Sequence, residues 1–425
     1  MTAVRQVDVL VVGAGPAGLA AAARLATAGA GRVEVLERET RPGGVPRHCA
    51  HGGFGTWTRP LTGPHYAHLL TAAAERAGAV IRTRTTVLDW EVAATSGTNV
   101  LLTVGPEGPE ALAARAVVLA TGARERPRAA RLVPGTRPAG VYTTGELQQA
   151  VHLFGQRIGT RAVVVGARDV SYAAARTVRT AGAEVVALVT EHPRARTSPA
   201  RARSARLVQG VPLLTDTTVT ELLGHGRLSG VRVRHRDGRT TVLPCDTVVF
   251  TGDFVPDHEL ARRGALDLDP GTRGPAVHTA LHTSRPGVFA AGNLLHAVEP
   301  AGTAAREGAR AAAAVRRHLA GAPWPHPGIP VTVESQLRWI TPNRLTPNLL
   351  IPDRSHPAAA PPPPHLLRID APLPRPVLYV HQDGRLLHRA RLGVRTAQPH
   401  RTLTLGVSWH GRVDPEGGEV RVSAG

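Results

Sequence analysis

The chain of 425 residues contains no lysine, and all 51 of its basic residues are arginine. Without lysine, the chain has no residue for Schiff-base catalysis and none for the phosphate-binding lysine of a P-loop. Cysteine is also scarce, because Cys49 and Cys245 are the only two. Their separation excludes C-x-x-C, C-x4-C and zinc-finger spacings and argues against a disulfide scaffold. No cluster of metal-ligating residues is visible in the sequence, so we predict no metal site.

Long hydrophobic runs and targeting signals are missing as well. No run of 18 apolar residues occurs, so we predict no membrane span. The first apolar strand follows within a few residues of Met1, without the charged and apolar regions of a signal peptide. We therefore expect a cytoplasmic protein.

The formal net charge of +19 predicts a positive field that favours anionic ligands or an acidic electron-acceptor subunit. Aromatic residues make up only 3% of the chain, which leaves few surfaces on which bases could stack. No short basic cluster or nucleic-acid-binding motif is present. We therefore predict that nucleic acid is not a partner.

The most informative stretch is residues 7–19, VDVLVVGAGPAGL. A short apolar strand ends in a G-x-G-x-x-G turn formed by Gly13, Gly15 and Gly18, and an alanine-rich helical segment follows. In this setting the first glycine permits the turn, the second lets a pyrophosphate approach, and the third allows close helix packing. The next strand ends in Glu37, placed to bind an adenosine ribose. The pattern predicts a dinucleotide site at a helix N-terminus.

A second strand–turn–helix unit begins at Arg161 and repeats this plan. Its turn reads Gly166, Arg168 and Ser171 in the same register, so arginine stands where a glycine would admit the pyrophosphate. The guanidinium could bind phosphate or fill the groove. Binding of NAD(P) by these three residues therefore stays open.

Two further motifs complete the pattern. One strand ends in Ala120-Thr121-Gly122, and a late segment, 286–293, reads PGVFAAGN before a helix. With the opening turn, these motifs resemble the pyridine nucleotide–disulfide oxidoreductase superfamily of two-dinucleotide-binding-domain flavoproteins, over roughly residues 5–320.

The resemblance implies FAD as cofactor and an α/β fold. It predicts two Rossmann-like domains, with the FAD domain discontinuous and the second domain inserted, plus a small C-terminal all-β domain. We expect an FAD domain at 1–125 and 270–322, an NAD(P)-binding-like domain at 126–269, and a proline-rich linker with the β domain at 323–425. Carried over by motif, the FAD-binding residues are Gly13, Gly15, Pro16, Ala17, Gly18, Glu37, Arg38, Gly44, Thr121, Gly122, Gly292 and Asn293.

The sequence departs from the family in two places. Asn293 replaces the usual acid, which keeps an acceptor for the ribityl chain and loses the negative charge. The segment after Gly44 holds a single cysteine, Cys49, where disulfide reductases carry C-x4-C. We therefore predict that the chain is not a disulfide reductase of that type.

The segment around Cys49 narrows the resemblance. It is similar to the accessory FAD oxidoreductase of multi-component glycerol-3-phosphate dehydrogenases and to the alpha subunits of opine and amino-acid dehydrogenases. Cys49 and His51 are the candidate catalytic residues, with His48 as another acid or base. The flanking basic residues would favour a Cys49 thiolate. A small residue packed under the flavin is the alternative.

We expect an FAD-dependent dehydrogenase or dehydrogenase component. It would transfer hydride between flavin N5 and a small amine, amino acid or hydroxy acid, or a partner subunit such as a second flavoprotein. One alternative is an NAD(P)H-dependent flavin reductase or oxidase that uses Cys49 as a redox thiol. The other is a flavin electron-transfer subunit with no substrate of its own.

Overall fold

The computed structural model describes residues 4–56, 58–91, 98–207, 210–325, 327–346 and 362–425. Contacts within the chain divide it into two compact units. Unit 1 consists of Met1–Gly44, His65–Ala123 and Pro256–Gly425, and unit 2 of Val45–Pro64 and Arg124–Val255. Each unit is therefore assembled from separated stretches of sequence.

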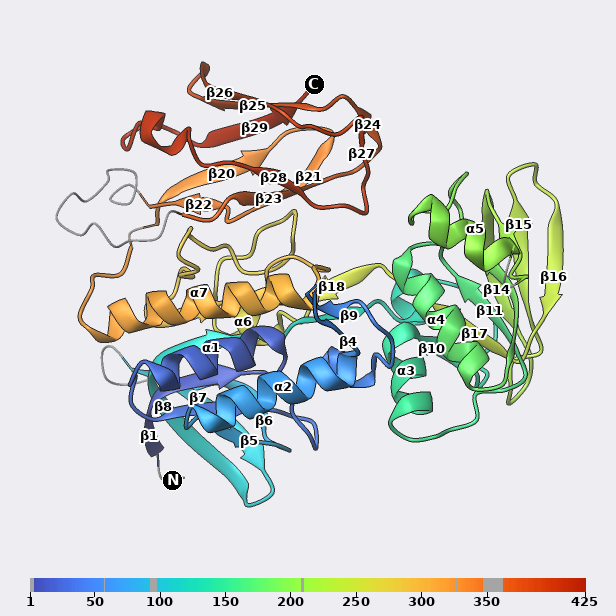
Figure 1. Ribbon diagram of the computed structural model, residues 1–425, viewed down its shortest axis with the longest axis horizontal. Helices are drawn as coiled ribbons and strands as arrows, with labels where there is room; N and C mark the ends of the chain where they lie inside the picture. The colour runs from blue at the N-terminus through green and yellow to red at the C-terminus, as the bar shows by residue number, and fades with distance from the viewer. Residues whose placement is uncertain (1–3, 57, 92–97, 208–209, 326, 347–361) are drawn as a thin grey trace. The chain divides into compact units, whose positions relative to one another are not determined.

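The centre of unit 1 is a seven-stranded sheet in the order β5-β2-β1-β8-β7-β6, with β19 also paired to β8 (Figure 1). The strands from β5 to β8 and β19 run parallel, whereas β7 and β6 extend the sheet antiparallel. Buried Val and Leu fill β1, β2 and the end of β8, as expected for strands covered on both faces. The strands are β1 Val4–Val12, β2 Val33–Leu36, β5 Val80–Arg82, β6 Thr86–Glu91, β7 Asn99–Gly105, β8 Gly108–Leu119 and β19 Val288–Ala290.

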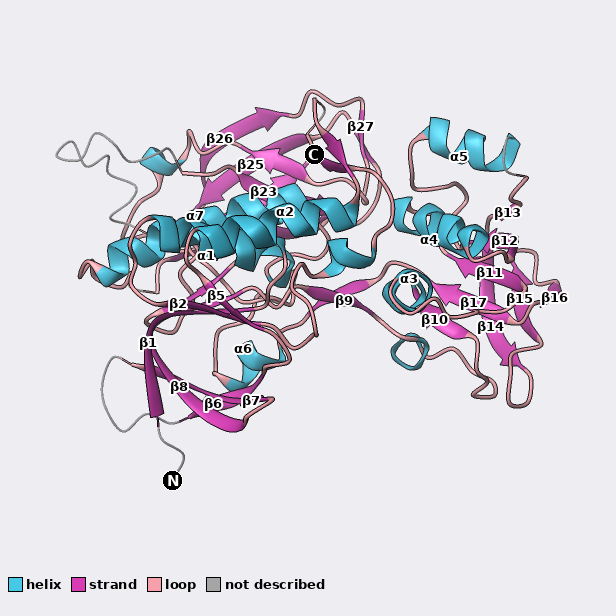
Figure 2. Ribbon diagram, turned by 60° about the horizontal axis from the view of Figure 1, so that its bottom comes forward, coloured by secondary structure: helices cyan, strands magenta, loops and turns pink. Residues whose placement is uncertain are grey.

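Helices α1 (Pro16–Thr27) and α7 (Ala301–Leu319) lie side by side on this sheet (Figures 1 and 2). Their alanines and glycines permit the close approach, because a β-carbon on Gly308 would lie 1.9 Å from the Ala17 carbonyl oxygen. Helix α2 spans Gly63–Arg76, and the short α6 (Glu259–Arg263) packs on β6. The helix pair therefore fixes the start of α1, where the first glycine turn ends.

Unit 2 repeats the parallel arrangement with the strand order β10-β17-β11-β12-β13. An antiparallel sheet, β14-β15-β16, follows in the chain. The parallel strands are β10 Val141–Thr143, β11 Arg161–Val165, β12 Glu184–Val189, β13 Leu213–Leu214 and β17 Thr247–Phe250. The antiparallel strands are β14 Thr217–Leu223, β15 Gly230–His235 and β16 Thr240–Pro244, and the helices are α3 Thr144–His152, α4 Asp169–Thr180 and α5 Pro199–Leu207.

Several short elements lie outside these sheets. The paired strands β9 (Ala123–Glu125) and β18 (Phe254–Pro256) occur where the chain passes between the units, and β3 (Phe54–Gly55) pairs with β4 (Pro60–Leu61). The 3-10 turns are η1 Val45–His48, η2 Arg128–Arg131, η3 Gly292–Leu294 and η4 His410–Arg412.

The end of unit 1 is a β domain with its own apolar core around the fully buried Trp409. A five-stranded sheet, β22-β20-β29-β25-β26, accompanies the three-stranded sheet β21-β23-β28 and the pair β24-β27. The strands are β20 Ile329–Val333, β21 Leu337–Thr341, β22 Arg344–Leu345, β23 His365–Ile369, β24 Leu373–Pro374, β25 Val377–Gln382, β26 Arg385–Arg391, β27 Thr396–Ala397, β28 Leu403–Leu405 and β29 Val420–Ala424.

The predicted fold class is confirmed, with two Rossmann-like sheets and a C-terminal all-β region. Asp237-Gly238 and Asp383-Gly384 form turns that each join two antiparallel strands. Within the range 323–425, which we predicted to hold the linker and the β domain, residues 329–345 form three strands of the β domain. Pro330, which has no N–H to donate, is tolerated there near the start of the strand. The next residue, Val331, donates its N–H to the Asn343 carbonyl oxygen. The predicted linker segment 358–364, AAAPPPP, lies outside the described residues up to residue 361.

The contact units also differ from the predicted domain boundaries. Residues 45–64 group with unit 2, and residues 256–269 group with unit 1. The first shift follows from the packing of η1 on α3. This shift places Cys49 in unit 2, whereas the glycine turn that precedes it in sequence belongs to unit 1.

Candidate functional site

The first glycine turn leaves room beside one of its three glycines. A β-carbon on Gly13 would lie 2.5 Å from the Ala120 carbonyl oxygen, and one on Gly18 would lie 1.9 Å from the Gly13 carbonyl oxygen. Gly15 differs, because nothing lies within 4 Å of the position that its β-carbon would take. Gly13 and Gly18 therefore serve packing, and the space beside Gly15 is open to a ligand.

The start of α1 offers unused backbone donors next to this space. Gly15 is the N-cap of the helix, and as a glycine it supplies no side-chain cap to the first turn. Pro16 occupies the first helical position, where its missing N–H costs nothing. An uncapped N-terminus carries partial positive charge and N–H groups that suit a phosphate.

Glu37 is buried directly beside this turn. One carboxylate oxygen accepts the Ala14 N–H at 3.0 Å, and the other accepts the Glu39 N–H at 2.9 Å. A carboxylate has about four acceptor positions, so each oxygen retains capacity for a ribose hydroxyl. Arg38, next in sequence, has an exposed guanidinium 3.4 Å from the Asp257 carboxylate.

The predicted Thr121-Gly122 turn lies beside the first glycine turn. The register between β1 and β8 places Val12 opposite Leu119, so both strands end at the same edge of the sheet. The Thr121 hydroxyl donates to the Asp257 carbonyl oxygen at 2.7 Å, which fixes the chain as it leaves unit 1. Gly44 also packs here, because its β-carbon would meet Gly15 Cα at 2.8 Å.

The late glycine motif joins this group from β19, which pairs with β8 and places Ala290 opposite Leu119. A β-carbon on Gly292 would meet the Ala17 β-carbon at 2.7 Å, so the motif packs directly on α1. Asn293 uses its carboxamide on a nearby backbone: its oxygen accepts the Glu299 N–H at 2.9 Å, and its nitrogen donates to the Glu299 carbonyl oxygen at 3.3 Å. One N–H and one lone pair of the carboxamide remain for a ligand.

The second glycine turn, in unit 2, is filled by hydroxyl groups. Ser171 is fully buried, and its oxygen accepts the Arg168 N–H at 3.0 Å and lies 2.6 Å from the Thr251 hydroxyl. A β-carbon on Gly166 would collide with both hydroxyls. Ser171 therefore closes the turn and caps α4, and Arg168 is half-buried. Their assignment to a nicotinamide nucleotide stays a prediction.

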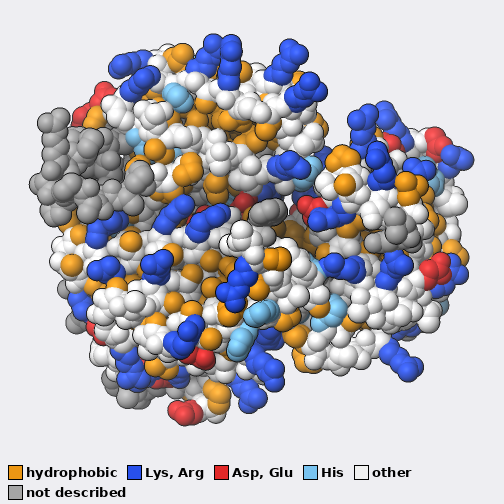
Figure 3. All heavy atoms as spheres, in the orientation of Figure 1, with side chains coloured by type: hydrophobic (Ala, Val, Ile, Leu, Met, Phe, Trp, Pro, Cys, Tyr) orange, Lys and Arg blue, Asp and Glu red, His pale blue; other side chains and the backbone are white. Residues whose placement is uncertain are grey.

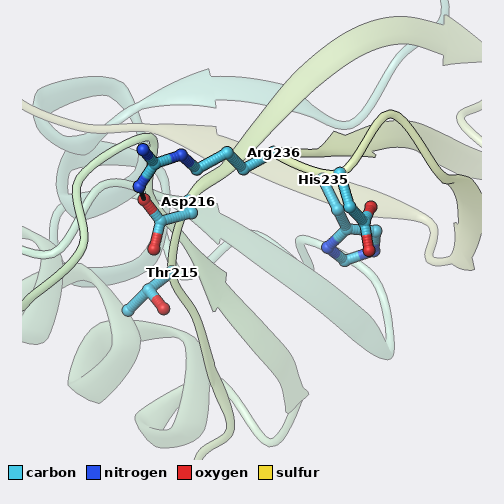
Figure 4. A pocket seen from close by; sticks show the side chains of 5 residues that line it. Thr215, Asp216, His235 and Arg236 are labelled. Atoms are coloured by element: carbon cyan, nitrogen blue, oxygen red, sulfur yellow. Dashed lines mark ion pairs between the residues drawn. The ribbon is translucent and has the colours of Figure 1, made fainter.

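Basic side chains gather near this second turn. Arg196 donates its backbone N–H to the Ala167 carbonyl oxygen, and burial together with the nearby Arg196 and Arg168 lowers the pKa of His192. On the face shown in Figure 3, blue side chains are spread widely and red ones are few. A depression between β13, β14 and β15 (Figure 4) contains none of the predicted site residues; it is lined by Thr215, Asp216, His235, Arg236 and Asp237.

Cys49 lies in unit 2, buried against α3. Its sulfur donates to the Gln148 side-chain oxygen at 3.4 Å. Burial, with the nearby Glu125 carboxylate, raises the pKa of the Cys49 thiol to about 12. The expectation of a stabilised thiolate is therefore wrong, because desolvation outweighs the basic residues that flank Cys49 in sequence. Cys245 is also buried, and burial raises its pKa to about 11.

The two histidines beside Cys49 differ in their surroundings. His51 is half-buried, with Nδ1 2.8 Å from the Gly52 carbonyl oxygen. His48 is buried, and neither of its ring nitrogens has a hydrogen-bond partner among the described residues. Burial and the nearby Arg47 lower the pKa of His48 to about 4, so the ring is neutral at physiological pH. A catalytic role for Cys49 or His51 remains a prediction.

Glu125 is a buried acid to which the sequence motifs assign no role. One oxygen accepts the Gly252 N–H at 2.8 Å, and the other accepts the Gly145 N–H at 3.1 Å. Burial raises the pKa of the Glu125 carboxyl despite these hydrogen bonds. Its position directly after the Thr121-Gly122 turn is the signal that could have drawn attention to it.

The residues of unit 1 fit the ADP half of FAD. Open space at Gly15, free donors at the start of α1 and the Glu37 carboxylate occur together at one sheet edge. This is the edge at which parallel α/β sheets bind nucleotides. Among the described helices, none is both long and apolar enough to cross a membrane.

Comparisons with known proteins agree with this geometry. The sequence model of the pyridine nucleotide-disulphide oxidoreductase family matches residues 7–308. The alpha subunit of sarcosine oxidase from Corynebacterium sp. (strain P-1) is 31% identical over 337 residues, covering 74% of this chain and 30% of the relative. An opine oxidase subunit from Rhizobium meliloti is 30% identical over 67% of this chain and 58% of its own length. The chain thus spans less than two thirds of these relatives.

A thioredoxin reductase is similar over nearly its whole length. The protein from Mycolicibacterium smegmatis is 30% identical over 74% of this chain and 96% of its own length. Among solved structures, the thioredoxin reductase of T. acidophilum shares the fold, with a TM-score of 0.63 at 24% identity, 74% coverage of this chain and 99% of its own. The L-proline dehydrogenase of P. horikoshii gives 0.55 at 16% identity, over 76% of this chain and 58% of its own.

Proposed function

The chain belongs to the pyridine nucleotide-disulphide oxidoreductase family, and from this premise we propose that it is an FAD-dependent dehydrogenase or dehydrogenase component. The proposed reaction moves a hydride from a small amine, amino acid or hydroxy acid to flavin N5. Relatives named as oxidase subunits support a partner subunit that receives the electrons. The family and these relatives support FAD as the cofactor.

The observation that carries the proposal is the open space beside Gly15. In the proposed complex the uncapped start of α1 binds the pyrophosphate through backbone N–H groups, and Glu37 accepts from the ribose hydroxyls. Asn293 offers its remaining N–H and lone pair to the ribityl chain. FAD, when bound, supplies the two-electron acceptor, and these residues hold and orient it.

Cysteine chemistry of the disulfide reductases is not part of the proposal. The chain has only Cys49 and Cys245, both free and buried, and burial keeps both thiols protonated at neutral pH. Exchange chemistry needs a thiolate. In the proposed reaction, Cys49 packs beside Gln148 and carries no electrons.

A second candidate is an NAD(P)H-dependent flavin reductase. The observation in its favour is the pair Arg168 and Arg196 beside the second glycine turn, which suits an anionic nucleotide. The buried hydroxyls of Ser171 and Thr251 weigh against it, because they fill the turn. The dehydrogenase therefore remains the leading proposal.

Anaerobic titration of the purified yellow protein tests both candidates. We expect secondary amines, amino acids or hydroxy acids to bleach the flavin absorption band, and NADH and NADPH to leave it unchanged over the same time. Rapid bleaching by either nucleotide would establish the second candidate instead. A yellow protein that none of these compounds reduces would point to a role in electron transfer alone. A colourless protein that takes up no added FAD would overturn the cofactor assignment.

A further inference from the structure

The C-terminal β domain lies beyond the region matched by the family model, yet it reaches the segment that follows Gly292. Two of its residues contact Glu299, namely Arg368 on β23 and Thr402 just before β28, and Trp339 on β21 contacts Arg368. We call these four residues the Glu299 cluster. Trp339 and Arg368 are direct cross-strand partners, so the sheet register sets them side by side.

Arg368 makes the central contact of the cluster. Its Nη2 donates to the Glu299 carboxylate at 2.9 Å and to the Val298 carbonyl oxygen at 3.3 Å. The Thr402 hydroxyl donates to the same Glu299 oxygen. The Arg368 guanidinium also lies over the Trp339 ring, 5.3 Å from its centre. Both charged side chains are almost fully buried, with 11% and 6% of their surfaces exposed.

The backbone of Glu299 links this contact to Asn293, the predicted flavin ligand that follows Gly292. Its N–H and carbonyl group are the two partners of the Asn293 carboxamide. The orientation of the Asn293 side chain therefore depends on where residue 299 is held. Arg368 holds residue 299 from the β domain, so a contact outside the Rossmann-like fold sets the direction of a predicted flavin ligand.

A second connection runs in parallel. The Gly292 N–H donates to the Glu307 carboxylate at 3.0 Å, and the other Glu307 oxygen lies 2.8 Å from His296 Nε2. The His296 ring lies against Trp339, with the ring centres 5.6 Å apart. Both ends of the segment 292–299 are therefore tied to residues of the same small β-sheet.

The composition of the cluster argues against a purely stabilising role. Taking two charges out of water costs free energy that a buried ion pair rarely recovers in full, and an apolar pair of similar volume often serves stability as well or better. Polar groups around a site instead fix the orientation of the groups that touch a ligand. The Glu299 cluster has the geometry of such a support.

We propose that the C-terminal β domain positions the flavin-contacting segment, with Arg368 acting through Glu299 to orient the Asn293 carboxamide. Arg368 is a positioning residue, and it touches no cofactor or substrate in this scheme. The inference rests on the FAD assignment and on Asn293 as a flavin ligand. It gives the appended domain a role inside the oxidoreductase site.

The test compares two arginines that join the β domain to the rest of unit 1. Arg368→Met breaks the Glu299 cluster, whereas the matched control Arg344→Met breaks the 2.9 Å ion pair with Asp267, away from Gly292 and Asn293. We expect Arg368→Met to raise the dissociation constant of FAD on the order of tenfold, the scale on which supporting residues act at bound metals. The visible spectrum and midpoint potential of the bound flavin should also shift. Arg344→Met should leave all three unchanged.

A double-mutant cycle separates positioning from general weakening. Asn293 and Arg368 share Glu299 as a partner, so the effects of Asn293→Ala and Arg368→Met on FAD affinity should be strongly non-additive. Glu299→Gln keeps the backbone groups and an acceptor oxygen, and we expect it to retain most of the wild-type flavin spectrum. Additive effects, or equal behaviour of the Arg344 and Arg368 variants, would overturn the proposal.

Arg368→Met leaves Glu299 buried without its partner, so that variant can fail to fold. The double variant Glu299→Gln/Arg368→Met removes both charges and then decides the question by the same three measurements. A wild-type protein that binds no FAD would refute the cofactor assignment itself. Wild-type FAD binding with unchanged flavin properties in the double variant would refute only the positioning role.

Discussion

The two glycine turns of this chain share a backbone plan and differ in what fills it. Each follows a buried parallel strand, and each begins with a glycine at positive φ, +103° for Gly13 and +127° for Gly166. The N–H of each glycine bonds to the end of the next strand, at Leu36 and at Val189. Beyond that point, the first turn leaves open space beside Gly15, whereas the second carries Arg168 at the matching position and a contact between the Ser171 and Thr251 hydroxyls.

The two turns also differ in how the helices that follow them begin. In the first turn the helix N-terminus has no side-chain cap, which leaves its donors for a ligand. In the second turn Ser171 supplies the cap, and Asp169 adds a carboxylate to the first helical turn. A capped and acidic helix start is stable without an anion.

The largest expected effect comes from filling the open turn. Gly15→Arg should abolish FAD retention, because the side chain would occupy the pyrophosphate position while the β-carbon itself meets no atom. The ratio of flavin to protein absorbance after purification measures the loss. Gly393→Arg, at another glycine with open space around it, is the control that should stay yellow. Stoichiometric FAD in the Gly15 variant would contradict the site assignment.

The burial of Cys49 in unit 2 predicts an unreactive thiol. Its pKa of about 12 lies above that of a free thiol, so the folded protein holds Cys49 protonated at pH 7. In a Cys245→Ser background, alkylation by iodoacetamide should be at least about a hundredfold slower in the native than in the unfolded protein. The native rate should keep rising through pH 10, whereas the unfolded rate levels off above its pKa. Rapid alkylation near neutral pH would restore the redox-thiol alternative. Cys49→Ser should leave FAD bound.

Removing the Ser171 cap at the second turn should lower the free energy of unfolding moderately and leave FAD bound. Ser171→Ala loses the hydrogen bonds to the Arg168 N–H and the Thr251 hydroxyl, which together are worth about 1–2 kcal/mol of unfolding free energy. Urea unfolding followed by circular dichroism measures the change. The matched substitution in the first turn is Gly18→Ala. It should lower stability and, unlike Ser171→Ala, also cause loss of FAD, because its β-carbon collides with the Gly13 carbonyl. Loss of FAD from the Ser171 variant would break the distinction between the turns.

The smallest expected effect is that of restoring a glycine to the second turn. Arg168→Gly should leave the rate of flavin reduction by NADH or NADPH unchanged, because the Ser171 and Thr251 hydroxyls still fill the turn. Stopped-flow absorbance at the flavin band measures this rate. A faster reaction would identify the guanidinium as the only obstruction, and a slower one would make it a phosphate ligand.

Much of the fold could be predicted from sequence because its signals are local. The apolar strands ending in Gly13 and Gly166, and the turns at Asp237-Gly238 and Asp383-Gly384, depend on residues adjacent in the chain. The grouping of Gly13, Glu37 and Thr121 follows from the parallel sheet that such units build.

The parts that sequence reasoning missed depend on burial by distant segments. Flanking arginine and histidine suggested a reactive Cys49, but burial against α3 and the carboxylate of Glu125, both far along the chain from Cys49, raise its pKa. Helix α3 itself was not predicted, although Thr143 and Glu146 form a capping box at its start. Nothing near Arg368 in sequence points to Glu299.

The assignment of residues 45–64 to unit 2 has a practical consequence for dissecting the protein. The chain passes between the units after Gly44, Pro64, Ala123 and Val255. A fragment cut at 124 and 255 would therefore lack the segment that carries Cys49 and lose the packing of η1 on α3. To express either unit alone, its separate stretches of sequence must be joined by engineered linkers.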